Sequence, residues 1–546
     1  MRLSIHQEVF HFDAPIRLID IPKIQQSKAI MALVNNRLRE LRYVISEDAQ
    51  IELLDLTHPE TIFAYEASLR YLVAMAFNEA MPEVKYKFNY SISRSTFCHI
   101  LSLPKGQTLA KVMKTLEKKM RELVDADLPF ERLELSIDEA RAVYLKEGYH
   151  DKLESLRYRP EERVHLYQTG HYINYMYHLM VASTGVLKSF NLVMYPPGFL
   201  IQYPRAEVKG LIPPFEDAPI FSRVLKDANR WSERIGAHTI AQINDYVGLK
   251  KTAEFVQMNE SKHNQMIAEL GQTIEKNRDD IRLIAIAGPS SSGKTTFSTR
   301  LRIELLTQGL KPVMISLDDY YLDRDQILPN EEGIIDLEHI ETLDIALLNQ
   351  NLRDLINGEV VELPEFDFHQ KQRKGYKKLQ VAHNQPIIIE GIHALNDRLT
   401  SLIPKSQKYK IFIAPMLQIN QDYHNPISLT NLRLLRRIVR DQKYRNAPAE
   451  RTISMWDSVR KGEFKWIYPH QESADYIFNS GLLYEFGVLK HYAMASLETI
   501  ERDSPFFITA NRLIKFLKYF KAIDPRHVPC NSLLREFIGE SCFELE

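Results

Sequence analysis

Cysteine is scarce in this sequence: its 546 residues include three, Cys98, Cys530 and Cys542. Their number is odd and they do not stand at the spacing of a metal site, so a disulfide framework is not expected. Such sparse cysteine is typical of a reducing compartment, and we expect the cytoplasm.

A net charge and a long apolar run are missing as well. The 70 Lys and Arg residues nearly balance the 71 Asp and Glu residues, so the chain as a whole has no general attraction to nucleic acid or to a membrane surface. No apolar run is long enough to cross a bilayer. The start, MRLSIHQEVFHF, lacks the hydrophobic stretch of a signal peptide. These features predict a soluble globular protein.

The length predicts about three or four domains, and turn-forming prolines near residues 196–214 mark one boundary. We expect α+β modules over residues 1–62 and 63–215, a helical connector over 216–280, an α/β domain over 281–495 and a helical segment over 496–546. Hydrophobic periodicity predicts helices at 29–34, 65–80, 109–124 and 140–148, and a strand at 84–92.

A phosphate-binding loop is the most informative motif. Residues 283–297 read LIAIAGPSSSGKTTF, which contains the complete G-x-x-x-x-G-K-[ST] pattern between a strand-like run and a helix-like run. The glycines and small serines let backbone N–H groups surround a phosphate chain, Lys294 can reach the β- and γ-phosphates, and the Thr295 hydroxyl can bind Mg²⁺. The alternative is a Gly/Ser turn that binds nothing. The candidate nucleotide-binding residues are Gly288, Ser290, Ser291, Ser292, Gly293, Lys294, Thr295 and Thr296.

The α/β domain contains further strand-like runs at 312–317, 386–391 and 409–414, with helical patterns between them. This alternation predicts a parallel sheet flanked by helices, the fold class of P-loop proteins. Two of the runs end in acids: Asp318 and Asp319 follow one, and Glu390 ends the other. Carboxylates at the ends of parallel strands are candidates for a catalytic base or a Mg²⁺ ligand, although Asp can also simply cap a helix.

A helix is expected around residues 432–445, where Arg433, Arg436, Arg437 and Arg440 share one face. The stripe could be a solvated surface, or a lid whose guanidinium groups bind polyphosphate. The basic stretch 364–378 favours a substrate-side hairpin over a nucleic-acid site. Because the guanine-reading motif N-K-x-D is missing, we expect ATP rather than GTP.

Together these motifs resemble the uridine/cytidine kinase family, within the phosphoribulokinase–uridine kinase group. The resemblance is carried by GPSSSGKTT (288–296), ISLDDYYLDRD (315–325), IIDLEHIETLD (334–344), PEFDF..KQRK (364–374), IIIEGIHAL (387–395) and RLLRRIVRD (433–441). It implies transfer of the ATP γ-phosphate to a nucleoside 5′-hydroxyl. It also implies Asp318 as base, Glu390 in the Mg²⁺ site, Tyr321, Asp336 and Arg373 around the nucleoside, and Arg436, Arg440 and Arg445 in the lid.

One position departs from the family pattern. A His two residues before the position of Arg373 reads the base in the family, but this chain has Lys371 there, and its nearest His is His369. A pocket that hydrogen-bonds a base edge discriminates strongly, so this change puts the choice of pyrimidine in question.

The N-terminal half resembles other proteins. VNNRLRELRYVI (34–45) and IELLDLTHPE (51–60) look like a TGS domain, and the stretch from residue 68 to 193 is similar to the second additional domain of threonyl-tRNA synthetase. That domain edits with His and Cys side chains, whereas the matching positions here are Tyr71, Met75, Met176 and Met180. We therefore expect the scaffold without its hydrolytic site.

The sequence thus leads to three hypotheses. The first is an ATP- and Mg²⁺-dependent nucleoside kinase acting on uridine or cytidine, with an appended synthetase-like region and, as in the family, a homo-oligomeric state. The second is the same chemistry on another small alcohol, such as a sugar phosphate or pantothenate. The third is an RNA-binding or regulatory protein that uses ATP as a switch, which the near-neutral charge does not favour.

Overall fold

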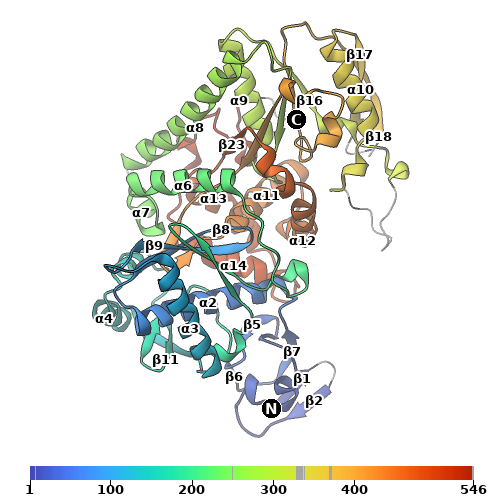
Figure 1. Ribbon diagram of the computed structural model, residues 1–546. Coiled ribbons are helices and arrows are strands. Elements are labelled where there is room, and N and C mark those ends of the chain that lie inside the picture. Colours follow the sequence, from blue (N-terminus) through green and yellow to red (C-terminus); the bar gives the residue numbers. More distant parts are fainter. Residues whose placement is uncertain are drawn as a thin grey trace.

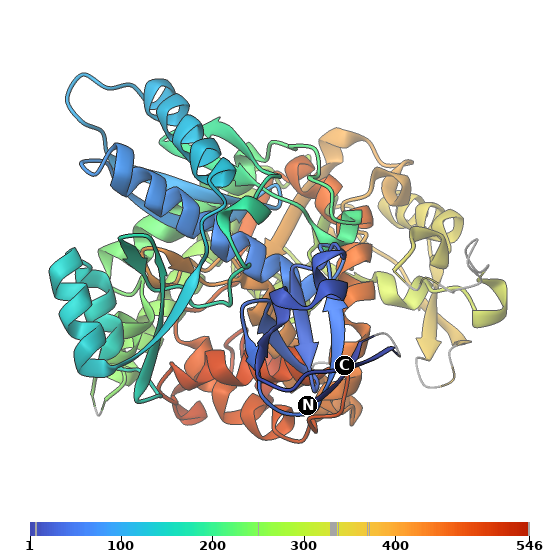
Figure 2. The same cartoon turned by 90° about the horizontal axis from the view of Figure 1, so that it is seen from below.

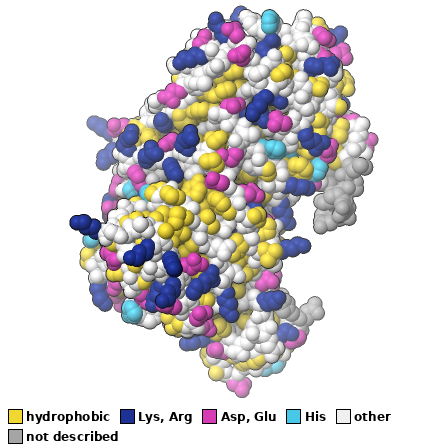
Figure 3. Space-filling view, viewed as in Figure 1, with side chains coloured by type: hydrophobic (Ala, Val, Ile, Leu, Met, Phe, Trp, Pro, Cys, Tyr) yellow, Lys and Arg dark blue, Asp and Glu magenta, His cyan; other side chains and the backbone are white. Residues whose placement is uncertain are grey.

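The computed structural model describes residues 1–5, 8–248, 250–327, 336, 338–367, 370 and 372–543 (Figure 1). The base-reading positions His369 and Lys371 lie outside these ranges. Within them no helix combines the length and the apolar content that a membrane span needs. On the face seen in Figure 3, basic and acidic side chains are interspersed over the whole length of the molecule.

The N-terminal module is a five-stranded sheet in the order β2-β1-β7-β4-β5. Its strands are β1 (Arg2–Ile5), β2 (Glu8–His11), β4 (Met31–Val34), β5 (Arg37–Glu40) and β7 (Ala49–Leu54). The short strands β3 (Ile16–Arg17) and β6 (Val44–Ile45), the 3-10 helix η1 (Leu18–Asp20) and the helix α1 (Pro22–Gln25) lie beside it.

The helix expected at residues 29–34 is wrong, because this apolar stretch forms strand β4. Asn35 and Asn36 follow it with φ angles of 47° and 57°, and β4 pairs with β5 in an antiparallel hairpin. Asn tolerates positive φ, and two such residues make the tight turn that joins neighbouring strands. Four buried apolar residues are too few for periodicity to separate a strand from a helix.

The following region is built around α2 (Pro59–Ala80), most of whose residues are buried. A sheet in the order β13-β14-β9-β8 and a sheet in the order β10-β11-β12 surround this helix. The expected strand at 84–92 and the helices at 65–80, 109–124 and 140–148 are confirmed. The elements are β8 (Lys85–Ile92), β9 (Ser95–Ser102), α3 (Leu109–Asp125), β10 (Glu131–Ser136), α4 (Ile137–Glu147), α5 (His150–Leu156), β11 (Arg163–Thr169), β12 (Tyr172–Asn174), β13 (Asn191–Tyr195) and β14 (Gly198–Gln202).

Three helices connect this region to the α/β domain: α6 (Pro219–Arg234), α7 (Ile240–Asp245) and α8 (Lys251–Lys276). The α/β domain has the expected parallel sheet, in the order β16-β19-β15-β20-β23. Its strands are β15 (Leu283–Ala287), β16 (Val313–Ser316), β19 (Ile387–Glu390), β20 (Lys408–Ala414) and β23 (Tyr476–Asn479). The last strand, β23, was not among the expected ones.

Helices cover both faces of this sheet because its strands carry apolar side chains on both sides. Ile284 and Ile286 of β15 share a core with α8 and with α9 (Lys294–Thr307). Leu283 and Ala285 share the opposite core with α6 and with α10 (Ile345–Ile356). Further helices are α11 (Leu429–Arg445), α12 (Ala449–Trp466), α13 (Glu485–Leu497), α14 (Phe507–Lys518) and α15 (Arg535–Ile538).

Two hairpins leave the sheet. The basic stretch forms β17 (Val361–Asp367) and β18 (Gln372–Leu379), as expected, and with α10 it stands at one edge of the molecule in both Figure 1 and Figure 2. The other hairpin, β21 (Asn420–Asp422) and β22 (Asn425–Pro426), reaches the N-terminal half. There Phe88 N donates to Tyr423 O at 2.8 Å, and Asn420 Nδ2 donates to Phe88 O at 2.7 Å.

Candidate functional site

The phosphate loop lies between β15 and α9, at the carboxyl end of the parallel sheet. Two of its glycines are required by geometry. A Cβ on Gly288 would lie 2.1 Å from the backbone oxygen of Ile413, and Gly293 has a φ of 91°. The hydroxyl oxygens of Ser291, Ser292 and Thr296 are buried and have no hydrogen-bond partner within the described residues. Unpartnered buried hydroxyls at a helix N-terminus fit a phosphate chain.

Lys294 is the first residue of α9, and its Nζ donates to the carbonyl oxygen of Gly288 at 3.2 Å. Burial lowers the pKa of this ammonium, while the nearby carboxylates of Glu390, Asp318 and Glu536 raise it. The side chain is thus folded back onto the loop and surrounded by acids. When a phosphate binds, the flexible Lys294 side chain can rotate so that its ammonium group pairs with the phosphate instead of these acids.

The structure brings Thr295 and Glu390 together. Thr295 Oγ1 lies 3.5 Å from Glu390 Oε1, because the parallel pairing of β15 with β19 places Glu390 beside Ile286, just before the loop. Burial raises the pKa of Glu390 to about 7, and the charge of Asp318 adds to this rise. One hydroxyl and one carboxylate are a suitable protein share of a Mg²⁺ site, since Mg²⁺ takes its other ligands from phosphate and water.

Asp318 follows β16 and is oriented by its own backbone, whose N–H donates to Ser316 Oγ at 3.2 Å. The carboxylate is accessible to solvent, yet the surrounding protein reduces its hydration and raises its pKa, against the charges of Lys294, Arg445 and Arg440. Its neighbour Asp319 has a structural contact instead, because its Oδ1 accepts a hydrogen bond from Phe366 N at 3.3 Å.

The three residues expected around the acceptor differ in the groups that they contact. Tyr321 is near Asp318, whose charge helps to raise the tyrosine pKa after burial. Asp336 Oδ1 accepts a hydrogen bond from Glu338 N at 3.1 Å. Arg373 lies on β18 and donates to Asp344 Oδ2 at 2.9 Å, so its guanidinium is already paired in this state.

Three arginines of helix α11 point inward, not into solvent: Arg433, Arg436 and Arg437. Arg436 is fully buried and pairs with Glu485 through two hydrogen bonds of 2.6 and 3.0 Å. It also donates to the carbonyl oxygens of Ser291 and Ser292 at 3.3 and 3.4 Å. These carbonyls need donors in a buried position, and a guanidinium has five.

Two neighbouring arginines of α11 also bind the phosphate loop. We call Arg433, Arg436 and Arg437 together the brace of the loop. Arg433 pairs with Glu463 and donates to Ser290 O at 3.0 Å, and Arg437 donates to Ser290 Oγ at 3.0 Å. The solvated stripe is therefore wrong for these residues. The position of Arg436 also corrects the expectation that it belongs to a mobile lid, because it is fixed beneath the loop.

Arg440 and Arg445 are the arginines closest to the expected arrangement. Both form ion pairs with Asp441, at 3.5 and 3.3 Å, and the charges of both lower the pKa of Asp318. The charges of Arg440 and Arg445 therefore reach the Asp318 carboxylate.

Residues 283–483 match the family described as Phosphoribulokinase / Uridine kinase family. A protein named uridine kinase from Macrococcus caseolyticus is 33% identical over 201 residues, which cover 36% of this chain and 88% of that protein. The chain belongs to this family. The uridine kinase of Staphylococcus haemolyticus is 31% identical over 200 residues, covering 36% of this chain and 87% of that protein. A solved D-glycerate 3-kinase from Cryptococcus neoformans is 15% identical, with a TM-score of 0.20, and covers 49% of this chain and 87% of that one.

Two acids near the kinase-family site were missed by sequence reasoning. Glu338 has its pKa raised by burial, and then by the charges of Asp336 and Asp318, while Arg437 and Lys294 lower it. Its only sequence signal is its place in the family motif at 334–344. Glu536, whose carboxylate accepts a hydrogen bond from Thr296 N at 3.0 Å, lies 240 residues beyond the loop and has no local signal.

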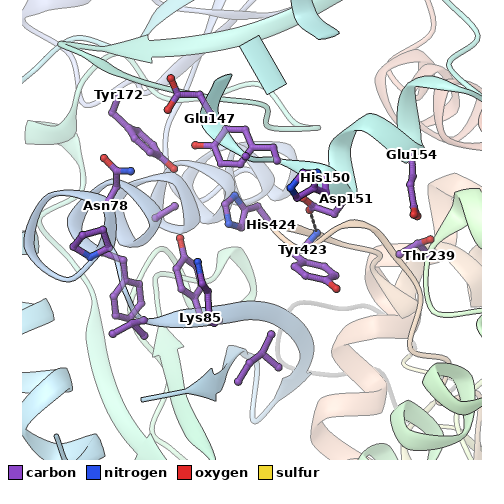
Figure 4. Close-up of a pocket in the computed structure, with 18 of the residues that line it drawn as sticks. Asn78, Lys85, Glu147, His150, Asp151, Glu154, Tyr172, Thr239, Tyr423 and His424 are labelled. Carbon is purple, nitrogen blue, oxygen red and sulfur yellow. Dashed lines mark hydrogen bonds between the residues drawn. The ribbon is translucent and has the colours of Figure 1, made fainter. Parts of the chain in front are cut away.

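A cavity of about 580 Å³ lies away from the kinase-family site, between the N-terminal half and the β21–β22 hairpin (Figure 4). The figure shows Tyr172 and His424 beside it, and Tyr423, whose backbone N donates to Asp151. The four positions that the sequence analysis compared with editing residues are buried, and Tyr71 Oη donates to the carbonyl oxygens of Tyr167 and Tyr172. The residues are Tyr71, Met75, Met176 and Met180.

Proposed function

We propose that this protein transfers the γ-phosphate of ATP to the 5′-hydroxyl of a nucleoside, with uridine or cytidine as the acceptor. The observation that carries the proposal is the meeting of Lys294, the Thr295–Glu390 pair and Asp318 at one end of the parallel sheet. The names of the curated relatives, which cover this domain, support the same acceptor class.

The residues divide the work of an in-line transfer. The backbone N–H groups of the phosphate loop and Lys294 hold the triphosphate, and Thr295 with Glu390 would hold Mg²⁺, which when bound neutralises phosphate charge. Asp318 accepts the proton of the attacking hydroxyl or orients that hydroxyl, and its raised pKa makes it a better proton acceptor. Arg440 and Arg445 stabilise the charge on the transferring group.

The acceptor side of the site supports an uncharged alcohol. The charges of Asp336 and Asp318 both act on Glu338 there, and this group of acids would repel a sugar phosphate or the carboxylate of pantothenate. A nucleoside has no charge and offers several hydroxyls to these acceptors. A sugar phosphate is accordingly the weaker alternative, although it belongs to the same family of reactions.

The test is ADP release with ATP and Mg²⁺ against a panel of nucleosides, a sugar phosphate and pantothenate. We expect turnover on a pyrimidine nucleoside, with Asp318→Asn lowering kcat by roughly 10²–10⁴-fold, the usual share of a general base. Lys294→Ala should abolish turnover. Asp319→Asn is the matched control, since that carboxylate bonds to Phe366 N, and it should keep most of the activity. Equal losses in Asp318→Asn and Asp319→Asn, or turnover only on an anionic acceptor, would contradict the proposal.

A further inference from the structure

The cavity of about 580 Å³ beside the β21–β22 hairpin has the size of a pocket for a small molecule. Its lining comes from residues 74–101, 147–172, 238–242 and 423–424. The N-terminal half, the connecting helices and the hairpin therefore enclose it together. All of these residues lie outside the kinase-family site, so a ligand here would be distinct from the nucleotide and its acceptor.

Aromatic rings gather around His424 at this cavity. The Tyr86 ring stacks on the imidazole, with centroids 5.5 Å apart and an interplanar angle of 6°. Tyr149 meets the same imidazole edge-on at 6.2 Å, and Tyr172 lines the cavity as well (Figure 4). Aromatic faces bind apolar bodies and attract cations.

His424 offers the cavity a hydrogen-bond donor in a fixed state. Tyr175 N donates to Asn174 Oδ1 at 2.8 Å, which orients the amide so that its Nδ2 donates to His424 Nδ1 at 2.8 Å. Burial, and then the charges of Lys152 and Arg70, lower the pKa of His424 well below its usual range. The ring is therefore neutral, with its proton on Nε2. Although His424 is only 9% exposed, this Nε2 has no hydrogen-bond partner among the described residues.

The Tyr86 hydroxyl is a second group without a partner in the described part of the chain. Other tyrosines of the lining are occupied: Tyr149 Oη donates to Ile173 O at 3.1 Å, and Tyr172 Oη accepts from Asn174 Nδ2 at 2.8 Å. Burial raises the pKa of Tyr86 well above its usual range, so it stays a neutral O–H. Because Tyr86 is stacked on His424, a ligand oxygen beside the two rings meets two donors.

The charged groups of the lining are mostly acidic. They are one lysine, Lys85, and three acids, Glu147, Asp151 and Glu154. These acids act on the aromatic wall: burial raises the pKa of Tyr149 to about 12, and the charges of Glu147 and Asp151 add to the rise. Such a lining attracts a cation and repels a phosphate or a carboxylate.

Asp151 is the acid that the structure holds in place. Its Oδ2 accepts a hydrogen bond from Tyr423 N at 2.7 Å, drawn in Figure 4. Burial raises the pKa of this carboxyl, and the charge of Lys152 opposes the rise. Lys152 itself pairs with Asp422. A carboxylate with little water around it gains from a cation beside it.

We propose that this cavity binds a small organic cation, an amine whose aromatic or apolar body carries a hydroxyl or carbonyl oxygen. The ammonium pairs with Asp151, the body lies against the stacked rings, and the oxygen accepts from His424 Nε2 and Tyr86 Oη. The inference goes beyond the proposed function and does not depend on it, because the two sites have different residues.

The probe is tyramine, which combines an ammonium, an aromatic ring and a hydroxyl. Three relatives change one group each: 4-ethylphenol lacks the ammonium, phenethylamine lacks the hydroxyl, and 4-hydroxyphenylacetate has a carboxylate instead of the ammonium. Ligand-observed NMR titrations on the full chain give the Kd values. We expect a tyramine Kd of about 1 mM or lower, as for a small fragment. Binding of 4-ethylphenol should be about tenfold weaker, and 4-hydroxyphenylacetate should not bind.

Two variants assign these preferences to residues. Asp151→Asn keeps an acceptor for Tyr423 N but removes the charge, so tyramine should bind about tenfold more weakly while 4-ethylphenol is unaffected. Tyr86→Phe should weaken tyramine about threefold and leave phenethylamine unchanged. Asp138→Asn is the matched control, because Asp138 is an exposed acid of α4 outside the cavity, and its tyramine Kd should equal that of the wild type.

Four results would each overturn the proposal: no binding of tyramine, 4-ethylphenol binding as tightly as tyramine, tighter binding of the carboxylate, or wild-type tyramine affinity in Asp151→Asn. Turnover is measured in none of these titrations. A chain that binds tyramine as expected but phosphorylates no nucleoside keeps the amine site and loses the proposed function. A chain that phosphorylates nucleosides but does not bind tyramine shows the reverse.

Discussion

His263 on α8 is an example of a single buried group that sets how stability responds to pH. Its ring is buried beside Phe478, at 5.3 Å between ring centroids, and neither ring nitrogen has a hydrogen-bond partner among the described residues. Burial first, and then the charges of Arg300 and Arg436, lower its pKa to about 3. The folded protein thus keeps this imidazole neutral where the unfolded chain would protonate it.

The sign of the effect follows from this lowered pKa. The unfolded chain takes up a proton near pH 6.5 and the folded chain does not, so stability is present above pH 6.5 and is lost as the pH falls. Between pH 7 and pH 5 this single group should account for a loss of about 2 kcal/mol. Urea unfolding at the two pH values measures it.

His263→Phe should reduce the difference between the two pH values by about that amount. His11→Asn, at an exposed position of β2, is the control and should leave the difference unchanged. A His263→Phe protein with the full acid sensitivity of the wild type would show that the ring is protonated in the folded state.

At the scale of elements, α11 supports the phosphate loop through buried guanidinium groups. Breaking a buried pair from one side leaves an uncompensated charge, at a cost of about 3–5 kcal/mol. We expect this loss of unfolding free energy for Arg436→Met, because Glu485 and two loop carbonyls lose their donor.

The double variant Arg436→Met/Glu485→Leu tests the cause. Removing both charges should restore a large part of the stability, while the loop carbonyls stay without their donor and nucleotide binding stays weak. Arg451→Met, at an exposed position of α12, is the control and should change stability by less than about 0.5 kcal/mol. A single variant as stable as this control would exclude the brace.

Helix α11 and the phosphate loop show which features of the site could be predicted from the sequence. The phosphate loop and the acids at strand ends were predictable, because their spacing is local and the parallel sheet brings strand ends together. The inward direction of Arg433 and Arg436 was not, because their partners Glu463 and Glu485 lie 30 and 49 residues further along. An arginine stripe has the same pattern whether water or buried acids face it.

Glu536 was hidden for the same reason at greater distance. Short runs failed for another reason: β4 was predicted as a helix and β23 was not among the expected strands, since four residues are too few for periodicity to decide. In this chain, motifs of neighbouring residues could be predicted from the sequence, whereas contacts between residues far apart in the sequence could not.

At the scale of the whole molecule, the β21–β22 hairpin joins the kinase-family domain to the N-terminal half. Lys152 Nζ of α5 lies 2.8 Å from Asp422 Oδ1 of the hairpin, and both side chains are fully buried. Asn425 Nδ2 donates to the same carboxylate, and His424 Nδ1 lies 2.8 Å from Asn174 Nδ2. The hairpin leads straight into α11, so the two halves and the phosphate loop are parts of one continuous structure.

This connection predicts that the two halves unfold together. Wild-type protein should give a single calorimetric transition. The halves cannot separate until the hairpin leaves the N-terminal half, and that step exposes the buried Lys152–Asp422 ion pair to water. Lys152→Met leaves Asp422 buried without its cation and should cost about 3–5 kcal/mol. Because this stability is lost at the contact between the halves, the N-terminal half and the kinase-family domain should unfold in two separate transitions.

Arg141→Met is the matched control. Arg141 and Asp138 both lie on α4, and their solvent-exposed side chains form an ion pair at 3.0 Å. Such a pair contributes little, and its loss should keep the single transition. Lys152→Met/Asp422→Asn should recover part of the loss, since the uncompensated charge is gone. One transition in Lys152→Met at the wild-type temperature would mean that other contacts hold the two halves together.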